Sequence, residues 1–322
     1  MVIKMKNSII NILKENKNQL ITGSYIAKEL NITRSYVNKV ILALIDEGYE
    51  IENISRSGYI YKSNIKILDK EYIENNISKK VEIFDEIDST NNYLKKLAKD
   101  KFQNNILVIA NYQTNGRGRL GRTFISDKSS GIYMSLLVRP NISINDAKKI
   151  TCLTAVAINN AINELTNLNS KIKWVNDIYI NNKKVCGILT EAQTSIEEGT
   201  IDYVIIGIGI NVYKREFDDS IKNIATSLEH EGVIISRNDL IIKIVNNIDT
   251  YLNDFTNDIY MKEYQNSSCI VGKEVELNIR GDIFKATVLK INDEGELVVR
   301  THDNKEFTVY SGEITRLVLN DK

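Results

Sequence analysis

Apolar residues in the first 62 positions recur every three or four residues, which is the spacing of one face of an α-helix. This pattern predicts three helices, in the stretches SIINILKEN, TGSYIAKELN and ITRSYVNKVILALIDEGYEI, the third beginning at Thr33 and ending at Gly48. The short turn at residues 30–32 is typical of a helix-turn-helix, and YEIENISRSGYIY predicts a two-stranded wing with its turn at residues 55–58. We therefore expect a winged helix-turn-helix domain over residues 1–62.

The pattern changes twice in the rest of the chain. Residues 63–80 are polar and unpatterned, which indicates a linker with one short helix. Residues 81–266 mix alternating and helical spacing, which predicts an α+β domain around a mixed or antiparallel sheet. The expected strands are 81–85, 106–112, 131–138, 171–174, 178–181, 184–192 and 200–212, and the expected helices are 90–99, 144–167 and 238–256. Residues 267–322 form short alternating runs with turns at 280–282, 292–295 and 302–304, which predicts a small SH3-like β-barrel.

Composition narrows the class of protein. A chain of 322 residues with 43% hydrophobic content predicts a globular protein of two or three domains. The balance of 42 Lys+Arg and 42 Asp+Glu excludes a generally basic nucleic-acid coat, so any binding of a polyanion must be local. Three scattered cysteines and two histidines fit neither a disulfide framework nor a zinc site. No apolar run reaches the length of a membrane span, and we expect a cytoplasmic protein.

The N-terminal domain is modestly basic within this neutral chain. Residues 1–65 contain nine Lys or Arg and six Asp or Glu. The side chains expected on the exposed side of the third helix and in the wing turn, where they could reach bases and phosphates, are Arg34, Ser35, Tyr36, Asn38, Lys39 and Arg56. Small three-helix domains also serve as protein adaptors, but the predicted wing favours DNA binding.

The stretch NGRGRLGRTF, residues 115–124, is rich in glycine and arginine. Gly116, Gly118 and Gly121 satisfy the dinucleotide-binding pattern G-x-G-x-x-G, and the stretch lies one substitution away from a Walker A loop. Both motifs require a strand just before and a helix just after the glycines. Here the preceding strand ends several residues earlier and another strand follows. We therefore predict a long mobile loop between two strands, which could be a solvated basic loop or a phosphate-binding one.

Other polar stretches fall at predicted strand and helix ends. DSTNNYLKK places Ser89, Thr90 and Asn91 at a helix start, and KWVNDIYINNKKVCGILTE gathers Lys173, Asn176, Asp177, Lys184 and Gly187 around the only Trp. VIIGIGINV carries Gly207 and Gly209 within an apolar strand, which indicates that another group approaches closely. A cap, a turn and a bulge would explain each stretch alone. Their joint occurrence favours a binding site.

These motifs, in this order and over nearly the full chain, resemble bifunctional biotin protein ligases that are also biotin operon repressors. The resemblance is carried by residues 89–91, Gln113 with 116–122, 173–177, Lys184 with Gly187, and 207–211. Val175 stands where the family usually has proline, and an aromatic pair near residue 123 is reduced to Phe124. The resemblance implies a winged helix, a catalytic core and a small C-terminal barrel.

The resemblance also implies a two-step reaction and a set of site residues. Biotin and ATP give biotinyl-5'-AMP, whose biotinyl group then passes to a lysine of a carrier domain. The implied catalytic cations are Lys184, Arg117, Arg119 and Arg122. The implied biotin-binding residues are Ser89, Thr90, Asn91, Gln113, Arg117, Gly118, Arg119, Lys184, Gly187, Gly207 and Gly209. The implied nucleotide-binding residues are Arg119, Arg122, Phe124, Lys173, Asn176 and Asn211, with Asp177 as the candidate for Mg²⁺.

The implied partners are operator DNA and the biotin carboxyl carrier protein of acetyl-CoA carboxylase or of another biotin-dependent carboxylase. Biotinyl-5'-AMP would be the corepressor and favour a homodimer formed through exposed strands of the middle domain. Two alternatives are a lipoate ligase and a ligand-sensing regulator without ligase activity. Lys184 and the three arginines favour a ligase, because a sensor of the neutral biotin ring would not need them.

Overall fold

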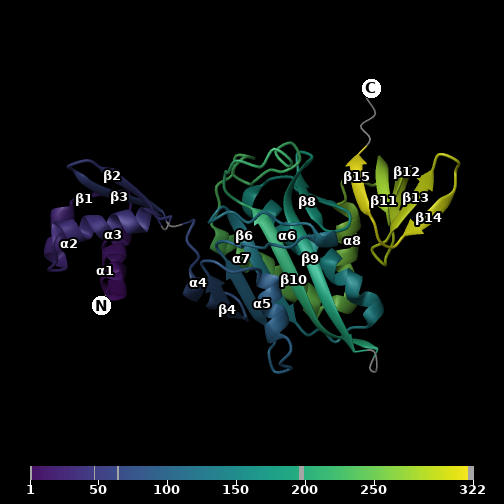
Figure 1. The fold of residues 1–322 in the computed structure, drawn as a ribbon, viewed down its shortest axis with the longest axis horizontal. Helices are drawn as coiled ribbons and strands as arrows, with labels where there is room; N and C mark the ends of the chain where they lie inside the picture. The colour runs from purple at the N-terminus through teal and green to yellow at the C-terminus, as the bar shows by residue number, and fades with distance from the viewer. Residues whose placement is uncertain (1, 47, 64, 196–198, 318–322) are drawn as a thin grey trace. The chain divides into compact units, whose positions relative to one another are not determined.

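The computed structural model describes residues 2–46, 48–63, 65–195 and 199–317 (Figure 1). The chain divides into two compact units. The first comprises Met1–Asp69 with Ser236–Asn238, and the second comprises Lys70–Ile235 with Asp239–Lys322.

The first unit is a helix-turn-helix with a small sheet. Its elements are α1 (Val2–Glu15), β1 (Leu20–Ile21), α2 (Gly23–Glu29), α3 (Arg34–Asp46), β2 (Glu50–Ile54) and β3 (Gly58–Ser63). Hydroxyl caps begin α2 and α3: Thr22 Oγ1 accepts from the backbone N–H of Tyr25 at 3.1 Å, and Thr33 Oγ1 accepts from that of Tyr36 at 3.2 Å. The three helices and the two-stranded wing are confirmed. The sequence did not predict β1, which pairs with β3, because two residues are too short to show an alternation.

One face of each helix packs into the core of this unit. The buried apolar side chains that meet there include Ile9, Leu13, Ile26, Val37, Ile41, Leu44 and Tyr59. Residues 65–69 belong to the same unit, where Asn238 binds them through both ends of its amide. Its Nδ2 donates to the carbonyl of Ile67 at 2.8 Å, and its Oδ1 accepts from the N–H of Asp69 at 3.0 Å. The predicted linker therefore begins with an ordered segment, and its predicted short helix is α4 (Lys70–Glu74) of the second unit.

A seven-stranded mixed sheet forms the centre of the second unit, in the order β4-β5-β6-β10-β9-β8-β7. Among the strand pairs of its described residues, only β4–β5 is parallel. The strands are β4 (Lys80–Phe84), β5 (Ile106–Ala110), β6 (Gly131–Val138), β7 (Lys171–Lys173), β8 (Asp177–Ile180), β9 (Lys183–Ser195) and β10 (Thr200–Asn211). All seven predicted strands are confirmed, with ends that differ by a few residues.

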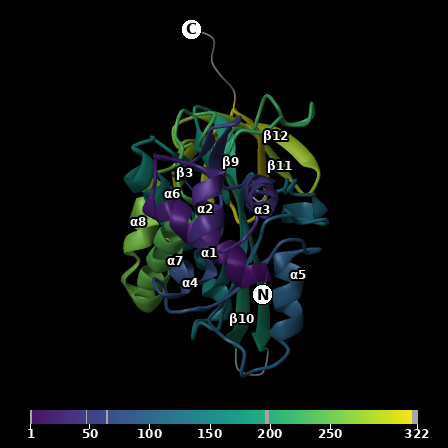
Figure 2. The same ribbon diagram turned by 90° about the vertical axis from the view of Figure 1, so that its left-hand side faces the viewer.

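Helices cover both faces of this sheet. They are α5 (Thr90–Leu97), η2 (Ile144–Lys148), α6 (Lys149–Thr166), α7 (Arg237–Asn253), η3 (Phe255–Asn257) and α8 (Ile259–Asn266). Leu94 of α5 packs against Leu137 and Ile205, whereas α6 contacts the opposite face, where its Thr151 meets Thr190. Figure 2 shows α5 on one side of the sheet and α6, α7 and α8 on the other. The predicted helix 144–167 begins as a 3₁₀ turn capped by Ser143, and the short polar α8 was not predicted.

The C-terminal part of the second unit is a five-stranded antiparallel sheet in the order β14-β13-β12-β11-β15. Its strands are β11 (Glu274–Ile279), β12 (Asp282–Ile291), β13 (Leu297–Thr301), β14 (Glu306–Val309) and β15 (Glu313–Leu317). The predicted short strands with intervening turns are confirmed over the described residues. No ladder joins the edge strands β14 and β15 in the part of the chain that the structure describes, so the predicted closed barrel is not confirmed. Across residues 2–46, 48–63, 65–195 and 199–317, no helix is both long and apolar enough to cross a membrane.

Candidate active site

One cavity is lined by residues from six separate segments of the second unit. The lining is formed by the start of α5, the loop that joins β5 to β6, Met134 of β6, the turn before β8, and the neighbouring strands β9 and β10. All eleven residues predicted to bind biotin line it: Ser89, Thr90, Asn91, Gln113, Arg117, Gly118, Arg119, Lys184, Gly187, Gly207 and Gly209. Phe124 and Asn176 of the predicted nucleotide set line the same cavity.

A hydrogen-bonded chain orients the polar groups at the start of α5. Ser89 Oγ caps the helix by accepting from the N–H of Asn92 at 3.4 Å. Thr90 donates to Gln113 Oε1 through its backbone N–H at 2.9 Å and its hydroxyl at 3.1 Å. Gln113 Nε2 then donates to Ser126 Oγ at 2.9 Å. The amide of Gln113 is therefore fixed in one orientation, which suits recognition of a ring with both donors and acceptors.

Two glycines of β10 make room for neighbouring side chains. A Cβ on Gly207 would lie 2.3 Å from Asn91 Oδ1, and a Cβ on Gly209 would lie 2.5 Å from the Phe124 ring. Both distances are far below van der Waals contact. The close approach predicted from these glycines is thus confirmed, and the groups that approach are an amide and a phenyl ring of the protein itself.

The arginine-rich stretch is a loop between β5 and β6, as predicted. An extended hairpin closes it, with the Phe124 N–H donating to the Gly116 carbonyl at 2.9 Å and the Gly118 N–H donating to the Arg122 carbonyl at 2.7 Å. Its tip is a single 3₁₀ turn, Arg119–Gly121. Residues 122–130, all of which the structure describes, contain no α-helix, so the rejection of a nucleotide-fold fingerprint is confirmed. The hairpin pairing was not predicted, because the stretch has no alternation of apolar residues.

Two cations of the cavity have polar partners in the turn before β8 and at the first residue of β8. Lys184 Nζ lies 2.7 Å from Asp177 Oδ1, and Arg119 Nη1 donates to Asn176 Oδ1 at 2.9 Å. Asn176 Nδ2 in turn donates to the carbonyl of Ile188 at 2.8 Å. The turn that carries Asn176 and Asp177 thus positions a lysine from β9 and an arginine from the loop between β5 and β6.

Glu191 of β9 joins three polar side chains beside the cavity. Its carboxylate accepts from Lys95 Nζ at 2.6 Å and from Asn91 Nδ2 at 2.9 Å, and it lies 3.4 Å from Arg117 Nη1. Burial opposes ionisation, but the hydrogen bonds from Lys95 and Asn91 hold the pKa of Glu191 below its usual value. Glu191 was not predicted from the sequence. Its position four residues after Gly187, on the same strand as Lys184, was the available signal.

Arg122, which was predicted as a catalytic cation, does not line the cavity and instead contacts the C-terminal sheet. Its guanidinium forms a bidentate ion pair with Glu313, in which Nη1 contacts Oε1 and Nη2 donates to Oε2 at 2.7 Å. No local motif could have identified Glu313, because 191 positions separate the two residues.

Besides Arg122, Lys173 and Asn211 of the predicted nucleotide set also lie outside the cavity lining. Lys173 is largely buried, with its Nζ 3.3 Å from Tyr179 Oη and 5.0 Å from the centre of that ring. Burial lowers the pKa of Lys173. Asn211 is also buried, and its Nδ2 donates to the carbonyl of Thr226 at 3.0 Å. Neither side chain meets the cavity in this conformation.

The predicted DNA-binding residues lie in the first unit. Arg34, Ser35, Asn38, Lys39 and Arg56 are exposed, and Tyr36 is half-buried against the core. Asn38 Oδ1 accepts from Tyr59 Oη of β3 at 3.1 Å. The third helix and the sheet are therefore joined at a side chain that was predicted to face DNA.

No group of three or more His, Cys, Asp or Glu side chains with the arrangement of a metal site occurs among the described residues. Asp177, the candidate for Mg²⁺, therefore belongs to no such group, and it lies beside Lys184 of the cavity. One carboxylate is compatible with Mg²⁺, which often takes one or two from the protein and its other ligands from substrate phosphates and water.

Comparisons with known proteins agree with this geometry. Residues 83–211 match the biotin/lipoate A/B protein ligase family, and residues 6–60 match an HTH domain. The bifunctional ligase/repressor BirA of Bacillus subtilis is 33% identical over 324 residues, covering 96% of this chain and 98% of the relative. BirA of Escherichia coli is 26% identical over 263 residues, covering 80% and 81%.

Among solved structures, the biotin protein ligase of Aquifex aeolicus in complex with biotin and ATP superposes with a TM-score of 0.63 at 28% identity. The likeness covers 74% of this chain and the whole of that one. The full-length match to a bifunctional relative includes both the helix-turn-helix and the ligase core. The chain therefore belongs to the family of bifunctional biotin protein ligases and repressors.

Proposed function

We propose that this protein joins biotin to ATP, transfers the biotinyl group to a carrier lysine, and represses transcription by binding operator DNA through its first unit. The observation that carries the ligase proposal is the single cavity in which Lys184, Arg117 and Arg119 meet the polar start of α5. A relative with 28% identity was solved with biotin and ATP, which supports the same ligands here.

The cavity suits chemistry between two anions. The biotin carboxylate must approach the α-phosphate of ATP, so fixed cations that offset both charges lower the barrier. Lys184 would bridge the carboxylate and the phosphate as a compact charge, while the arginines would hold phosphate oxygens through their paired donors. Asp177 would hold Mg²⁺, which supplies charge neutralisation on the phosphates when bound.

The remaining assignments follow from the family. Residues 1–62 would bind DNA, residues 81–266 would catalyse, and residues 267–322 would support the catalytic core. The acceptor would be the biotin carboxyl carrier protein of acetyl-CoA carboxylase or of another carboxylase. Biotinyl-5'-AMP would act as corepressor by favouring a homodimer in the cytoplasm, since two linked winged helices bind two half-sites far more tightly than one.

The test combines both activities in one preparation. The full chain is incubated with a carrier domain, ATP and either biotin or lipoate, and biotinylation and pyrophosphate release are followed. Operator binding and sedimentation are measured with and without biotin plus ATP. Biotin-dependent transfer with tighter DNA binding is the expected result. Lipoate transfer would indicate the related ligase, and biotin binding without pyrophosphate would indicate a sensor that does not catalyse.

A further inference from the structure

We propose that the turn between β12 and β13, residues 292–296, is a positioning element of the active site that acts through Trp174. It would hold the 173–177 turn, and so the partners of Arg119 and Lys184, in the arrangement that adenylation requires. This inference rests on the proposed ligase function. It gives the C-terminal sheet a role in the first chemical step.

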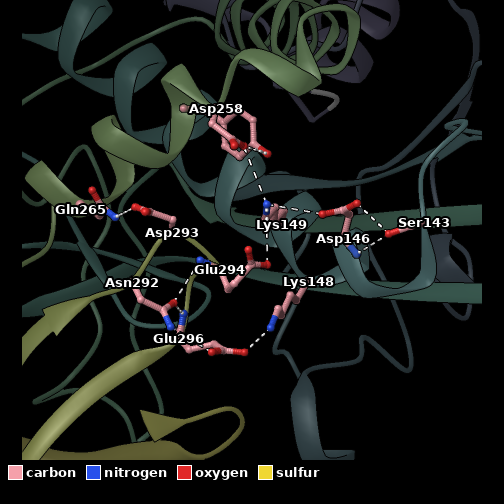
Figure 3. Close-up of polar contacts among 11 residues, drawn as sticks. Ser143, Asp146, Lys148, Lys149, Asp258, Gln265, Asn292, Asp293, Glu294 and Glu296 are labelled. Carbon is pink, nitrogen blue, oxygen red and sulfur yellow. Dashed lines mark hydrogen bonds and ion pairs between the residues drawn. The ribbon is translucent and has the colours of Figure 1, made fainter.

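Three polar contacts fasten this turn to the helices of the core (Figure 3). Glu296 forms an ion pair with Lys148 at the end of η2. Glu294 Oε2 lies 3.7 Å from Lys149 Nζ, the first residue of α6. Figure 3 also shows the third contact, in which Gln265 Nε2 of α8 donates to Asp293 Oδ1 at 3.1 Å. The side chains of Asp293, Glu294 and Glu296 therefore bind three different residues of the core.

The charges at the base of the turn are kept ionised by this arrangement. Burial opposes ionisation of Glu296, but hydrogen bonds from Lys148 and Asn292 keep its pKa below the usual value. For Lys149, burial lowers the pKa, but the nearby carboxylates of Asp258 and Glu294 raise it above the usual value. Each ion pair has one shielded and one exposed partner: Glu296 is 9% exposed and Lys148 41%, while Lys149 is 11% exposed and Glu294 52%. The two pairs therefore fasten the turn at the boundary between the core and solvent.

The tip of the turn enters the core too closely for any residue but glycine. Gly295 has a φ of 75°, in the left-handed region. A Cβ there would lie 2.8 Å from the buried Cys152 Sγ and 3.6 Å from Met261 Cε. The left-handed backbone of Gly295 and the close packing around it therefore fix the position and the direction of its carbonyl group.

That carbonyl binds the side chain of Trp174. The indole Nε1–H donates to the Gly295 oxygen at 3.0 Å in a buried hydrogen bond. The Tyr264 hydroxyl of α8 donates to the carbonyl of Val175 at 2.9 Å. The 173–177 turn is thus held by the C-terminal sheet at one residue and by α8 at the next.

The same turn carries the partners of two catalytic cations. Asn176 accepts from Arg119 at 2.9 Å, and Asp177 lies 2.7 Å from Lys184. A second cavity of the same unit is lined by Trp174, Val175 and Gly295 and also by Arg119, which lines the first cavity as well. A shift of the indole would therefore displace backbone within two residues of Asn176, at the side of the site where ATP is proposed to bind.

The test distinguishes a role in positioning the active site from a role in the stability of the protein alone. Trp174→Phe removes the indole donor but keeps an aromatic ring, and Glu296→Gln removes the charge that fastens the turn while leaving Trp174 in place. We expect adenylate formation in single turnover to slow about tenfold in Trp174→Phe, as for the loss of one buried hydrogen bond, and less in Glu296→Gln. Biotin binding in the absence of ATP should change less than about twofold in both. The matched control is Arg300→Gln, which breaks the exposed Arg300–Glu306 pair elsewhere in the same sheet and should leave both measurements unchanged.

Two results would overturn the proposal. One is an unchanged adenylation rate per folded molecule in both variants, with only the melting temperature lowered. The other is a parallel loss of biotin binding and adenylation, which would show a general disturbance of the core. If Trp174→Phe does not fold, Glu296→Gln alone decides between these results. Failure of the proposed ligase function is distinguishable, because the parent protein would then release no pyrophosphate with biotin.

Discussion

Lys184 Nζ lies 2.7 Å from Asp177 Oδ1, so the lysine proposed to meet the α-phosphate is positioned by a carboxylate seven residues earlier in the chain. The two side chains come from adjacent strands, β8 and β9, in which Asp177 pairs with Gly187. The absence of a side chain at Gly187 leaves space for the lysine stem, since a Cβ there would lie 3.1 Å from Lys184 Cε. Lysine, carboxylate and glycine therefore form one structural unit, which explains their occurrence in a single motif.

Replacing the Asp177 carboxylate distinguishes its two proposed roles, which are to hold Mg²⁺ and to position Lys184. We expect Asp177→Asn to raise the Mg²⁺ concentration for half-maximal adenylation by roughly tenfold, because the amide is a much weaker ligand for a hard cation. Biotin affinity should not change. The measurement is the initial rate of pyrophosphate release over a Mg²⁺ titration at saturating ATP and biotin. An unchanged Mg²⁺ dependence with a lower maximal rate would mean that Asp177 only orders Lys184.

The pair between Arg122 and Glu313 leads to a second prediction. The Glu313 carboxylate pairs with the two guanidinium donors of Arg122 that are proposed to hold phosphate. We therefore expect Glu313→Gln to lower the KM for ATP by about two- to fivefold, which is the range for an exposed ion pair, with biotin affinity unchanged. Glu306→Gln, which breaks another exposed pair in the same sheet, is the control. A higher KM for ATP in Glu313→Gln would show that Glu313 positions Arg122 instead of competing with phosphate.

The division into two units predicts that the activities can be separated. Deleting residues 1–62 should leave adenylation within about twofold of the parent and abolish specific operator binding, because every cavity residue lies beyond Asp88. This cut keeps residues 65–69, which Asn238 binds. Adenylation kinetics and an operator gel-shift titration give the two readouts. Specific operator binding by the truncated chain would contradict the assignment of the first unit.

The exposed side of α3 predicts the salt dependence of DNA binding. The logarithm of the association constant for operator DNA falls linearly with the logarithm of the salt concentration. Arg34→Ala and Lys39→Ala should each make this slope shallower by about one unit for each phosphate that the side chain neutralises in the parent. Lys14→Ala, on the last turn of α1, should leave the slope unchanged. The measurement is operator affinity over a salt series. Equal slopes for the parent and both α3 variants would show that neither side chain touches phosphate.

Local patterns in the sequence were enough to predict most of the fold. The seven central strands, the capped starts at Ser89 and Thr33, and the glycine pair of β10 each follow from a few neighbouring residues. The missed elements were short: β1 has two residues, and α8 has eight. The missed side chains act over long separations, as Glu313 and Gly295 do on Arg122 and Trp174. Such pairings depend on how the C-terminal sheet packs on the core, which no local spacing encodes.

The roles of Lys184 and Arg119 differ in timing. Lys184 is on strand β9 and should act as the carboxylate attacks the α-phosphate, so Lys184→Ala should slow adenylation by roughly 10²–10³-fold. Arg119 is at the tip of the loop and should help to keep it closed over the adenylate through Asn176. Arg119→Gly should therefore still form adenylate but release it faster, and the released adenylate should acylate lysines of bystander proteins.

The decisive experiment follows single-turnover formation and subsequent release of biotinyl-5'-AMP, side by side for the parent, Lys184→Ala and Arg119→Gly. We expect slow formation in Lys184→Ala, and in Arg119→Gly formation near the parent rate with accelerated release. Normal formation in Lys184→Ala, or adenylate held by Arg119→Gly as long as by the parent, would contradict this division of roles.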